Sequence, residues 1–274
     1  MAGVALFGVA VAGQDGNALR FTLKEGTDTY ASESKDEQSI EIPNVGTQST
    51  TVTKHSTYEL KYAGVDTAKD TANLTLTRTV DKVEATGDGA EQETSLKRKP
   101  FVLTGTVNSL GSTKFDLTKL NMTQALEVSG GSPAEGLIMQ MPEKAVKVGD
   151  TWDVKIAKGA TSYPEDQALK ATLTGEKDLD GAKVWVITVV GKAKVDMNTA
   201  QFPDDPDATG AGANLKLHLT GAADVNSTVF VDKASGKVLR SEEKVKLHGQ
   251  AELASPVITV ELNSTQTGTI TLKK

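Results

Sequence analysis

The side chains that most often do catalysis are few and scattered in this chain of 274 residues. There is no cysteine, which excludes thiol catalysis and zinc–thiolate sites. The three histidines, His55, His218 and His248, have no metal-ligand spacing such as His-Glu-x-x-His. Each also stands in an alternating pattern, opposite the apolar face of a strand. The pattern therefore predicts histidines exposed on strands rather than a metal site or a general base.

Two further patterns contain residues of a catalytic or metal-binding type. Ser241-Glu-Glu-Lys244 matches the Ser-x-x-Lys pattern of penicillin-interacting enzymes, but it lacks their helix start and partner motifs, so we interpret it as a solvated edge strand. Asp205-Pro-Asp-Ala-Thr-Gly210 opens like a calcium loop, yet Lys216 stands where the bidentate Glu should be, which favours an acidic loop. The sequence thus predicts no catalytic residue, no metal ligand and no cofactor, and we expect a protein that is not an enzyme.

Two stretches of the chain read alike, one from Leu19 to Tyr30 and one from Glu143 to Trp152. Each runs alternating apolar and polar residues into a glycine, followed by Asp-Thr and an aromatic residue. Gly26 and Gly149 can adopt positive φ, and the aspartates can accept bonds from nearby backbone N–H groups. The spacing is too long for a solenoid repeat and suits a duplicated β-unit. We expect two similar β-rich halves, residues 14–130 and 143–274.

Period-two alternation dominates the rest of the chain and predicts antiparallel strands with one wet face. An exception is the continuous apolar run 184–190, which predicts a central strand covered on both faces. Asp180-Gly181 is a two-residue hairpin signal that would join this run to the strand at 169–174.

A short linking helix is expected over residues 131–142. Ser132 would be its N-cap and Pro133 its first residue. Leu137, Ile138 and Met141 would then share the face that packs on the sheet. A second short helix is expected within 118–127. The sequence therefore predicts an all-β, mainly antiparallel fold with one or two short helices, whose two similar halves form a curved sheet or an open half-barrel.

The segment Met141-Pro-Glu-Lys-Ala-Val-Lys-Val-Gly-Asp-Thr-Trp152 resembles the Pro-x-Lys-x-Val-x-Val-Gly-Asp-x-Trp motif of a family of uncharacterised bacterial envelope proteins, here spanning Pro142 to Trp152. Residues 229–239 look like the strand–turn–strand that such proteins carry near their C-terminus. The family is usually secreted or lipid-anchored, so the resemblance implies an envelope setting. It transfers no catalytic residues. Its members often carry a lipid-modified cysteine, which this chain lacks.

The N-terminus supplies the evidence on localisation. A short apolar run over residues 4–11 overlaps the small-x-small triplet Ala10-Val-Ala12, the pattern of a signal-peptidase site. We expect residues 1–13 to be a signal-peptide remnant, with a buried first strand as the alternative. The run is too short to span a bilayer, and no other segment approaches transmembrane length. We expect an exported protein, periplasmic or extracellular in a bacterium.

Charge and architecture narrow the partners. The net charge of −6 and the absence of a strong basic segment argue against nucleic acid. A curved sheet commonly holds an apolar ligand on its concave side, so the leading hypothesis is a non-catalytic envelope protein that binds a lipophilic small molecule or a protein partner. Candidate contact residues are Leu137, Ile138, Met141 and Trp152. The alternatives are a structural or adhesive module without a ligand, and a hydrolase whose Asp and Glu residues are distant in sequence.

Overall fold

The computed structural model describes residues 16–96, 98–118, 120–127, 136–158, 163–204, 216–254 and 257–273. Three sequence expectations lie outside these residues: the signal-peptide remnant at 1–13, the start of the linking helix at 131–135, and the acidic loop at 205–210.

Eleven antiparallel strands form one sheet within the described residues. The first half of the chain contributes β1 (Gly26–Ile42), β2 (Gly46–Asp66), β3 (Thr71–Gly87), β4 (Phe101–Val107) and β5 (Thr113–Phe115). The second half contributes β6 (Thr151–Ile156), β7 (Gln167–Leu179), β8 (Ala182–Asn198), β9 (Leu217–Asp232), β10 (Val238–Ala254) and β11 (Val257–Leu272). The spatial order is β5-β4-β3-β2-β1-β11-β10-β9-β8-β7-β6, so the first and last strands of the chain are neighbours.

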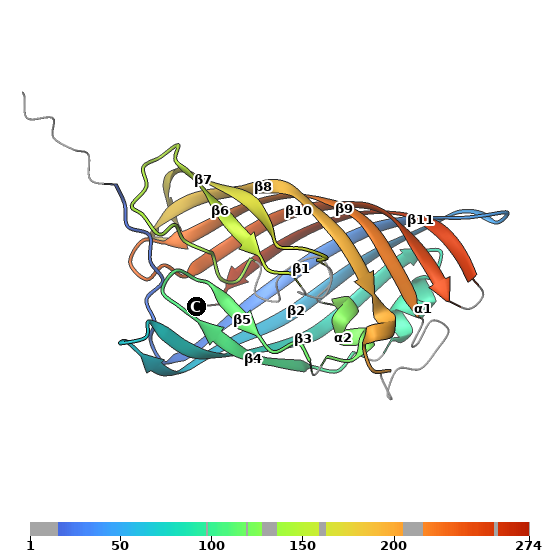
Figure 1. Cartoon of the computed structure of the whole chain (residues 1–274), viewed down its shortest axis with the longest axis horizontal. Helices are drawn as coiled ribbons and strands as arrows, with labels where there is room; N and C mark the ends of the chain where they lie inside the picture. The colour runs from blue at the N-terminus through green and yellow to red at the C-terminus, as the bar shows by residue number, and fades with distance from the viewer. Residues whose placement is uncertain are drawn as a thin grey trace, which may run out of the picture.

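The sheet curves around a common interior and stays open between its edge strands β5 and β6 (Figure 1). The curved, mainly antiparallel sheet expected from the sequence is confirmed. Because side chains alternate between faces, one half of each strand's residues line the concave face and the other half the convex face. The concave positions are mostly apolar, and the convex positions are mostly threonine and charged residues.

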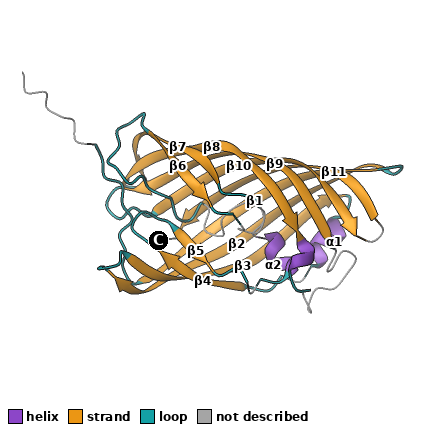
Figure 2. Cartoon of the chain, viewed as in Figure 1, coloured by secondary structure: helices purple, strands orange, loops and turns teal. Residues whose placement is uncertain are grey.

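The helical elements are short. They are α1 (Ala90–Ser95), α2 (Met122–Glu127) and the 3₁₀ turn η1 (Thr199–Gln201), and Figure 2 shows the helices near one end of the curved sheet. The start of α2 is a capping box, since Asn121 Oδ1 accepts the Gln124 N–H at 2.9 Å and Gln124 Oε1 accepts the Asn121 N–H at 3.2 Å. The Met122 N–H donates to the Pro203 carbonyl at 2.9 Å, which joins the two halves of the chain at this end.

The expected linking helix is wrong over its described part. Residues 136–142 form a turn followed by extended chain, which we call the strap. Leu137, Met139 and Met141 are buried, so the apolar residues follow period two rather than the helical period. The Met141 N–H donates to the Leu110 carbonyl at 2.7 Å, and the Met139 carbonyl lies against Gly111. The segment is extended rather than helical because an extended backbone can bond both to the turn before β5 and to the edge strand β6.

The strap forms hydrogen bonds to the free edge of β6, mainly through the side chain of Gln140. Gln140 Oε1 accepts the Lys155 N–H at 3.0 Å, and Gln140 Nε2 donates to the Lys155 carbonyl at 2.8 Å. The Trp152 indole N–H also donates to the Gln140 carbonyl at 2.9 Å. Unpaired strand edges template further pairing. The strap therefore satisfies part of an edge that the open sheet would otherwise leave bare.

Turn chemistry follows the sequence closely. Asp180 and Gly181 both take positive φ, 50° and 85°, and join β7 to β8 as a two-residue hairpin with Leu179 opposite Ala182. Gly149 also takes positive φ, 96°, as expected. Asp150 accepts the Lys147 N–H at 2.9 Å. Asp28 differs from the expectation, because it binds Lys237 at 2.7 Å instead of nearby backbone.

Tyr30 and Trp152, the matching aromatic residues of the two similar stretches, have different surroundings. Tyr30 lies in β1, which has a partner strand on each side, and is buried. Trp152 lies in β6, at the edge of the sheet, and is half-buried. The equivalence of the two halves as a duplicated unit stays a prediction.

The apolar run of β8 is covered on one face along its length and on both faces only at its start. Trp185, Ile187 and Val189 are buried on the concave side, and Val184 is buried on the convex side. Val190, also on the convex side, is 41% exposed. The expectation of coverage on both faces is therefore wrong at this end of the run, because no described layer packs on the convex face there.

Candidate functional site

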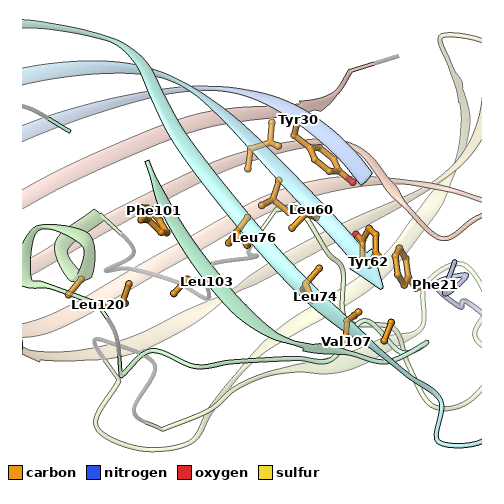
Figure 3. Packing of buried hydrophobic residues seen from close by; sticks show 14 residues of the cluster. Phe21, Tyr30, Leu60, Tyr62, Leu74, Leu76, Phe101, Leu103, Val107 and Leu120 are labelled. Carbon is orange, nitrogen blue, oxygen red and sulfur yellow. The ribbon is translucent and has the colours of Figure 1, made fainter. Parts of the chain in front are cut away.

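Three apolar clusters occupy the concave face, and two of them have a cover. The first centres on β1 to β4 and is covered by Leu120, Ala125 and Leu137. Figure 3 shows its packed side chains, with Leu120 approaching from outside the sheet. The second centres on β7 to β10 and is covered by Leu19, Met139 and Met141. In both clusters a second layer of chain lies on the sheet.

The third cluster has no second layer among the described residues. All of its members come from the strands β1, β8, β9, β10 and β11 themselves. Its half-buried side chains form what we call the aliphatic stripe: Ile40, Ile42, Leu217, Val245, Leu247, Ile258 and Leu262. Six buried residues accompany these seven, whereas the second cluster has 14 buried residues and five half-buried ones. The stripe is thus a half-buried apolar part of the concave face on which no second layer lies among the described residues.

Glycines leave room beside the stripe. Gly249 of β10 pairs with Gly221 of β9, and Leu262 of β11 lies next to Gly249 in the same row. Neither glycine has a side chain to fill the concave face at this level. A Cβ on Gly249 would collide with the Thr220 carbonyl oxygen, which shows how closely the two backbones approach. Such glycines both bend a sheet and leave space above it.

A polar band crosses the concave face at one end of the stripe. Asp36 of β1 accepts a bond from Gln38 Nε2 at 2.5 Å and one from Ser264 Oγ of β11 at 2.6 Å. Gln266 of β11 lies opposite Asp36, and Val245 of β10 lies opposite Gln266. Hydrogen-bonding side chains therefore adjoin aliphatic ones on a single face.

Glu243 of β10 is the second carboxyl of this band. In the sheet register it stands between Gly268 of β11 and Ser227 of β9. Protein atoms crowd the side chain enough that burial raises the pKa of its carboxyl, although the residue keeps part of its exposure. Within the described residues it has no hydrogen bond or ion pair. A crowded carboxyl that is still accessible and has no partner is suited to receive a ligand group.

The interpretation of Ser241 to Lys244 as a solvated edge is wrong. β10 lies between β9 and β11, well inside the sheet, and Ser241 is buried on the concave face. Lys244 is exposed on the convex face, because an offset of three residues places the two on opposite sides of a strand. A Ser–Lys catalytic pair is therefore impossible here.

A second polar group lies beside the first cluster. Asp28 and Lys237 form an ion pair that ties β1 to the turn between β9 and β10. Tyr30 and Tyr62 lie nearby, and burial, with a smaller effect from the negative charge of Asp28, raises the pKa of both phenols. Tyr30 and Tyr62 belong to the packed first cluster, and we assign them and the ion pair beside them to stability.

The four expected contact residues do not converge. Leu137 is buried in the first cluster with Ile138 beside it, whereas Met141 belongs to the second cluster. Trp152 is half-buried against the second cluster. Sequence analysis missed Glu243 and the stripe. The signal was the inward register of β10, which reads Ser241, Glu243, Val245, Leu247, Gly249 and Ala251.

The convex face offers little chemistry. His218 lies there beside Asp196, with 2.7 Å between Nε2 and Oδ1, and His55 lies 3.8 Å from Glu33. An open hollow of about 500 Å³ adjoins His55 and Glu33. Over the residues that the structure describes, no three His, Cys, Asp or Glu side chains gather as metal ligands would. None of the helices in these ranges has the length and apolar character needed to cross a membrane.

Comparison with known proteins gives distant likenesses only. No family model and no curated protein matches the chain. It is similar to DynF from the dynemicin biosynthesis pathway of Micromonospora chersina, at 12% identity and a TM-score of 0.23, over 93% of this chain and 89% of that chain. It is also similar to a mutant of the Rh. blastica porin, at 10% identity and a TM-score of 0.23, over 91% of this chain and 100% of that chain. At such scores these likenesses carry no argument.

Proposed function

We propose that this chain is a non-catalytic bacterial envelope protein that binds a lipophilic small molecule on the aliphatic stripe. Export is supported by the apolar run and small-residue triplet at the N-terminus. Binding is supported by the third cluster, in which a single layer of sheet presents half-exposed aliphatic side chains with no described chain across them. This uncovered layer is the observation that carries the proposal.

The dimensions of the stripe suit one aliphatic chain. At about 3.3 Å per residue, the path along β10 from Val245 to Ala251 is about 20 Å. Apolar surface of this kind contributes about 25 cal/mol for each Å² removed from water. A ligand that covers the stripe would supply the second layer that the strap supplies elsewhere.

The competing function is a structural or adhesive module without a ligand. The strap favours it, because Leu137, Met139 and Met141 already fill the concave face over the first two clusters. The two functions differ in what covers the third cluster. A ligand is required only by the first.

The test is native mass spectrometry of protein purified from its own envelope, paired with thermal unfolding in the presence of uncharged single-chain lipids such as monododecanoyl glycerol. Binding at a hundredfold excess over the dissociation constant would stabilise the fold by about 2.7 kcal/mol. Spectra without bound mass and unfolding curves that no lipid shifts would leave the structural module as the better account.

A matched pair of variants locates the binding surface. Leu247→Asn places an amide within the stripe and should abolish the lipid-induced shift. Val190→Asn makes the same kind of change at an exposed convex position and should preserve it. Equal loss in both variants would contradict binding on the concave face.

A further inference from the structure

We propose that the ligand is an amphiphile with a positively charged head, an aliphatic amine in chemical class, and that Glu243 receives this head while the stripe receives the chain. This inference rests on the proposed function of the stripe. It adds the chemistry of the head group, which the stripe alone leaves open.

The position of Glu243 matches the head of a ligand lying along the stripe. Val245 is the next residue of β10 on the same face, about 6.6 Å further along at 3.3 Å per residue. A Cβ built on Gly268 would lie 3.4 Å from Glu243 Oε1, so the carboxyl stands over a position that has no side chain. The head and the chain of one molecule can therefore occupy neighbouring places on this face.

The charges facing Glu243 favour a cation. On β1 the nearest charged group of the concave face is Asp36, which already accepts two bonds. On β2 it is Lys54, which is separated from Glu243 by Ser34 and Gly268 in the same row and has another interaction.

The other described elements around Glu243 present no charged side chain to it. The inward neighbours of Glu243 on β9 and β11 are uncharged: Val225, Ser227, Val229, Gln266 and Ile270. The strap contributes Gly136, which packs on Ser241 and Ile270. Among the described residues, the surroundings of the head are thus acidic overall.

The two carboxyls, Glu243 and Asp36, should discriminate among the head groups of lipids. A carboxylate or phosphate head would meet two carboxyls of like charge, which destabilises its bound state. An ammonium head would instead pair with Glu243 and donate hydrogen bonds to it, which offsets the cost of holding an unpartnered carboxylate among protein atoms. Because binding stabilises the ionised form, a protonated Glu243 would release its proton when the amine binds.

The test compares three probes with the same chain on the whole protein: dodecylamine, dodecanoate and monododecanoyl glycerol, each below its micelle-forming concentration. Titration calorimetry should show dodecylamine binding at least tenfold more tightly than dodecanoate. Repeating the amine titration at several pH values, in buffers of different ionisation enthalpy, should show proton release that grows as pH falls through the folded pKa of Glu243.

Glu243→Gln and Glu242→Gln form the matched pair. Both replace one carboxyl with an amide, but Glu242 lies on the convex face and pairs with Arg240 at 2.7 Å. Glu243→Gln should abolish the preference for the amine and the proton release, and Glu242→Gln should retain both. If the uncharged lipid binds and the amine preference is absent or survives Glu243→Gln, the head-group inference is overturned while the proposed function stands. If no probe binds, the proposed function fails and this inference with it.

Discussion

The first and third clusters occupy the same face of the same sheet, yet of these two only the first is covered by chain that the structure describes. Leu60, Leu74 and Leu76 of the first cluster lie at 0% to 1% exposure beneath a second layer of chain. Leu247 and Leu262 of the third cluster remain half-buried, because every member of that cluster belongs to the sheet itself. The difference shows that curvature alone does not bury a concave face. A second layer is needed, and here the described chain supplies it over only part of the sheet.

The largest expected effect of this comparison is on stability. Trp185→Ala, in the covered second cluster, should lower the free energy of unfolding by about 3–5 kcal/mol through cavity formation. Leu60→Ala should cost about 2–5 kcal/mol for the same reason. Leu262→Ala, in the uncovered stripe, should cost less than about 1 kcal/mol in the ligand-free protein, since little contact is lost.

Urea unfolding midpoints check this ranking, with His218→Ala as the surface control expected within about 0.5 kcal/mol of the parent protein. Equal midpoint shifts for Leu60→Ala and Leu262→Ala would show that the third cluster is as well packed as the first. That result would contradict the claim that the first cluster is packed beneath a second layer and the third is not.

A smaller effect is expected where the strap meets the edge of β6. Gln140→Ala removes both bonds to the Lys155 backbone, which should cost about 1–3 kcal/mol by leaving edge groups unpaired. As a control, Thr174→Ala removes a side-chain hydrogen bond to the Val186 carbonyl at 3.0 Å, between the paired strands β7 and β8 and away from a free edge. Size-exclusion chromatography should show self-association for the first variant alone, because only its change frees an edge. Monomeric behaviour of both variants would limit the strap to a packing role.

The smallest effect concerns the charge of Glu243. Its folded-state pKa is raised by burial, so the folded protein binds the proton more tightly than the unfolded chain does. That stabilising contribution is fully present below the unfolded pKa of about 4.3 and is lost as pH rises through the folded pKa. Glu243→Gln should therefore raise the melting temperature at pH 7 relative to the parent and leave it nearly unchanged at pH 4. A uniform shift at both pH values would contradict an isolated, crowded carboxyl.

Local chemistry made parts of the fold predictable from sequence. The Asp180-Gly181 hairpin depends only on the turn residues and their flanks, and alternating side chains indicate strands without tertiary information. The strap was missed because Leu137, Ile138 and Met141 suit either a helix or an extended path. Its partners, such as the Leu110 carbonyl, come from elsewhere in the chain.

The candidate site was missed for a different reason. Which of Glu242 and Glu243 faces inward depends on register, and β10 carries an irregularity between Val238 and Arg240 where it pairs with β9. A shift of one residue exchanges the two faces of a strand. Sequence pattern therefore predicted a curved sheet with a concave face, but not which carboxyl stands on it.

Methyl NMR of the whole protein tests the central claim most directly, because Leu, Ile and Val methyl groups report separately on the covered and uncovered regions. On addition of a single-chain lipid, the resonances of Val245, Leu247 and Leu262 should shift, and those of Leu60, Leu76 and Ile187 should stay in place. Shifts spread evenly over both sets, or no shift at Leu247 and Leu262 when the lipid binds, would contradict a ligand surface on the uncovered part of the concave face.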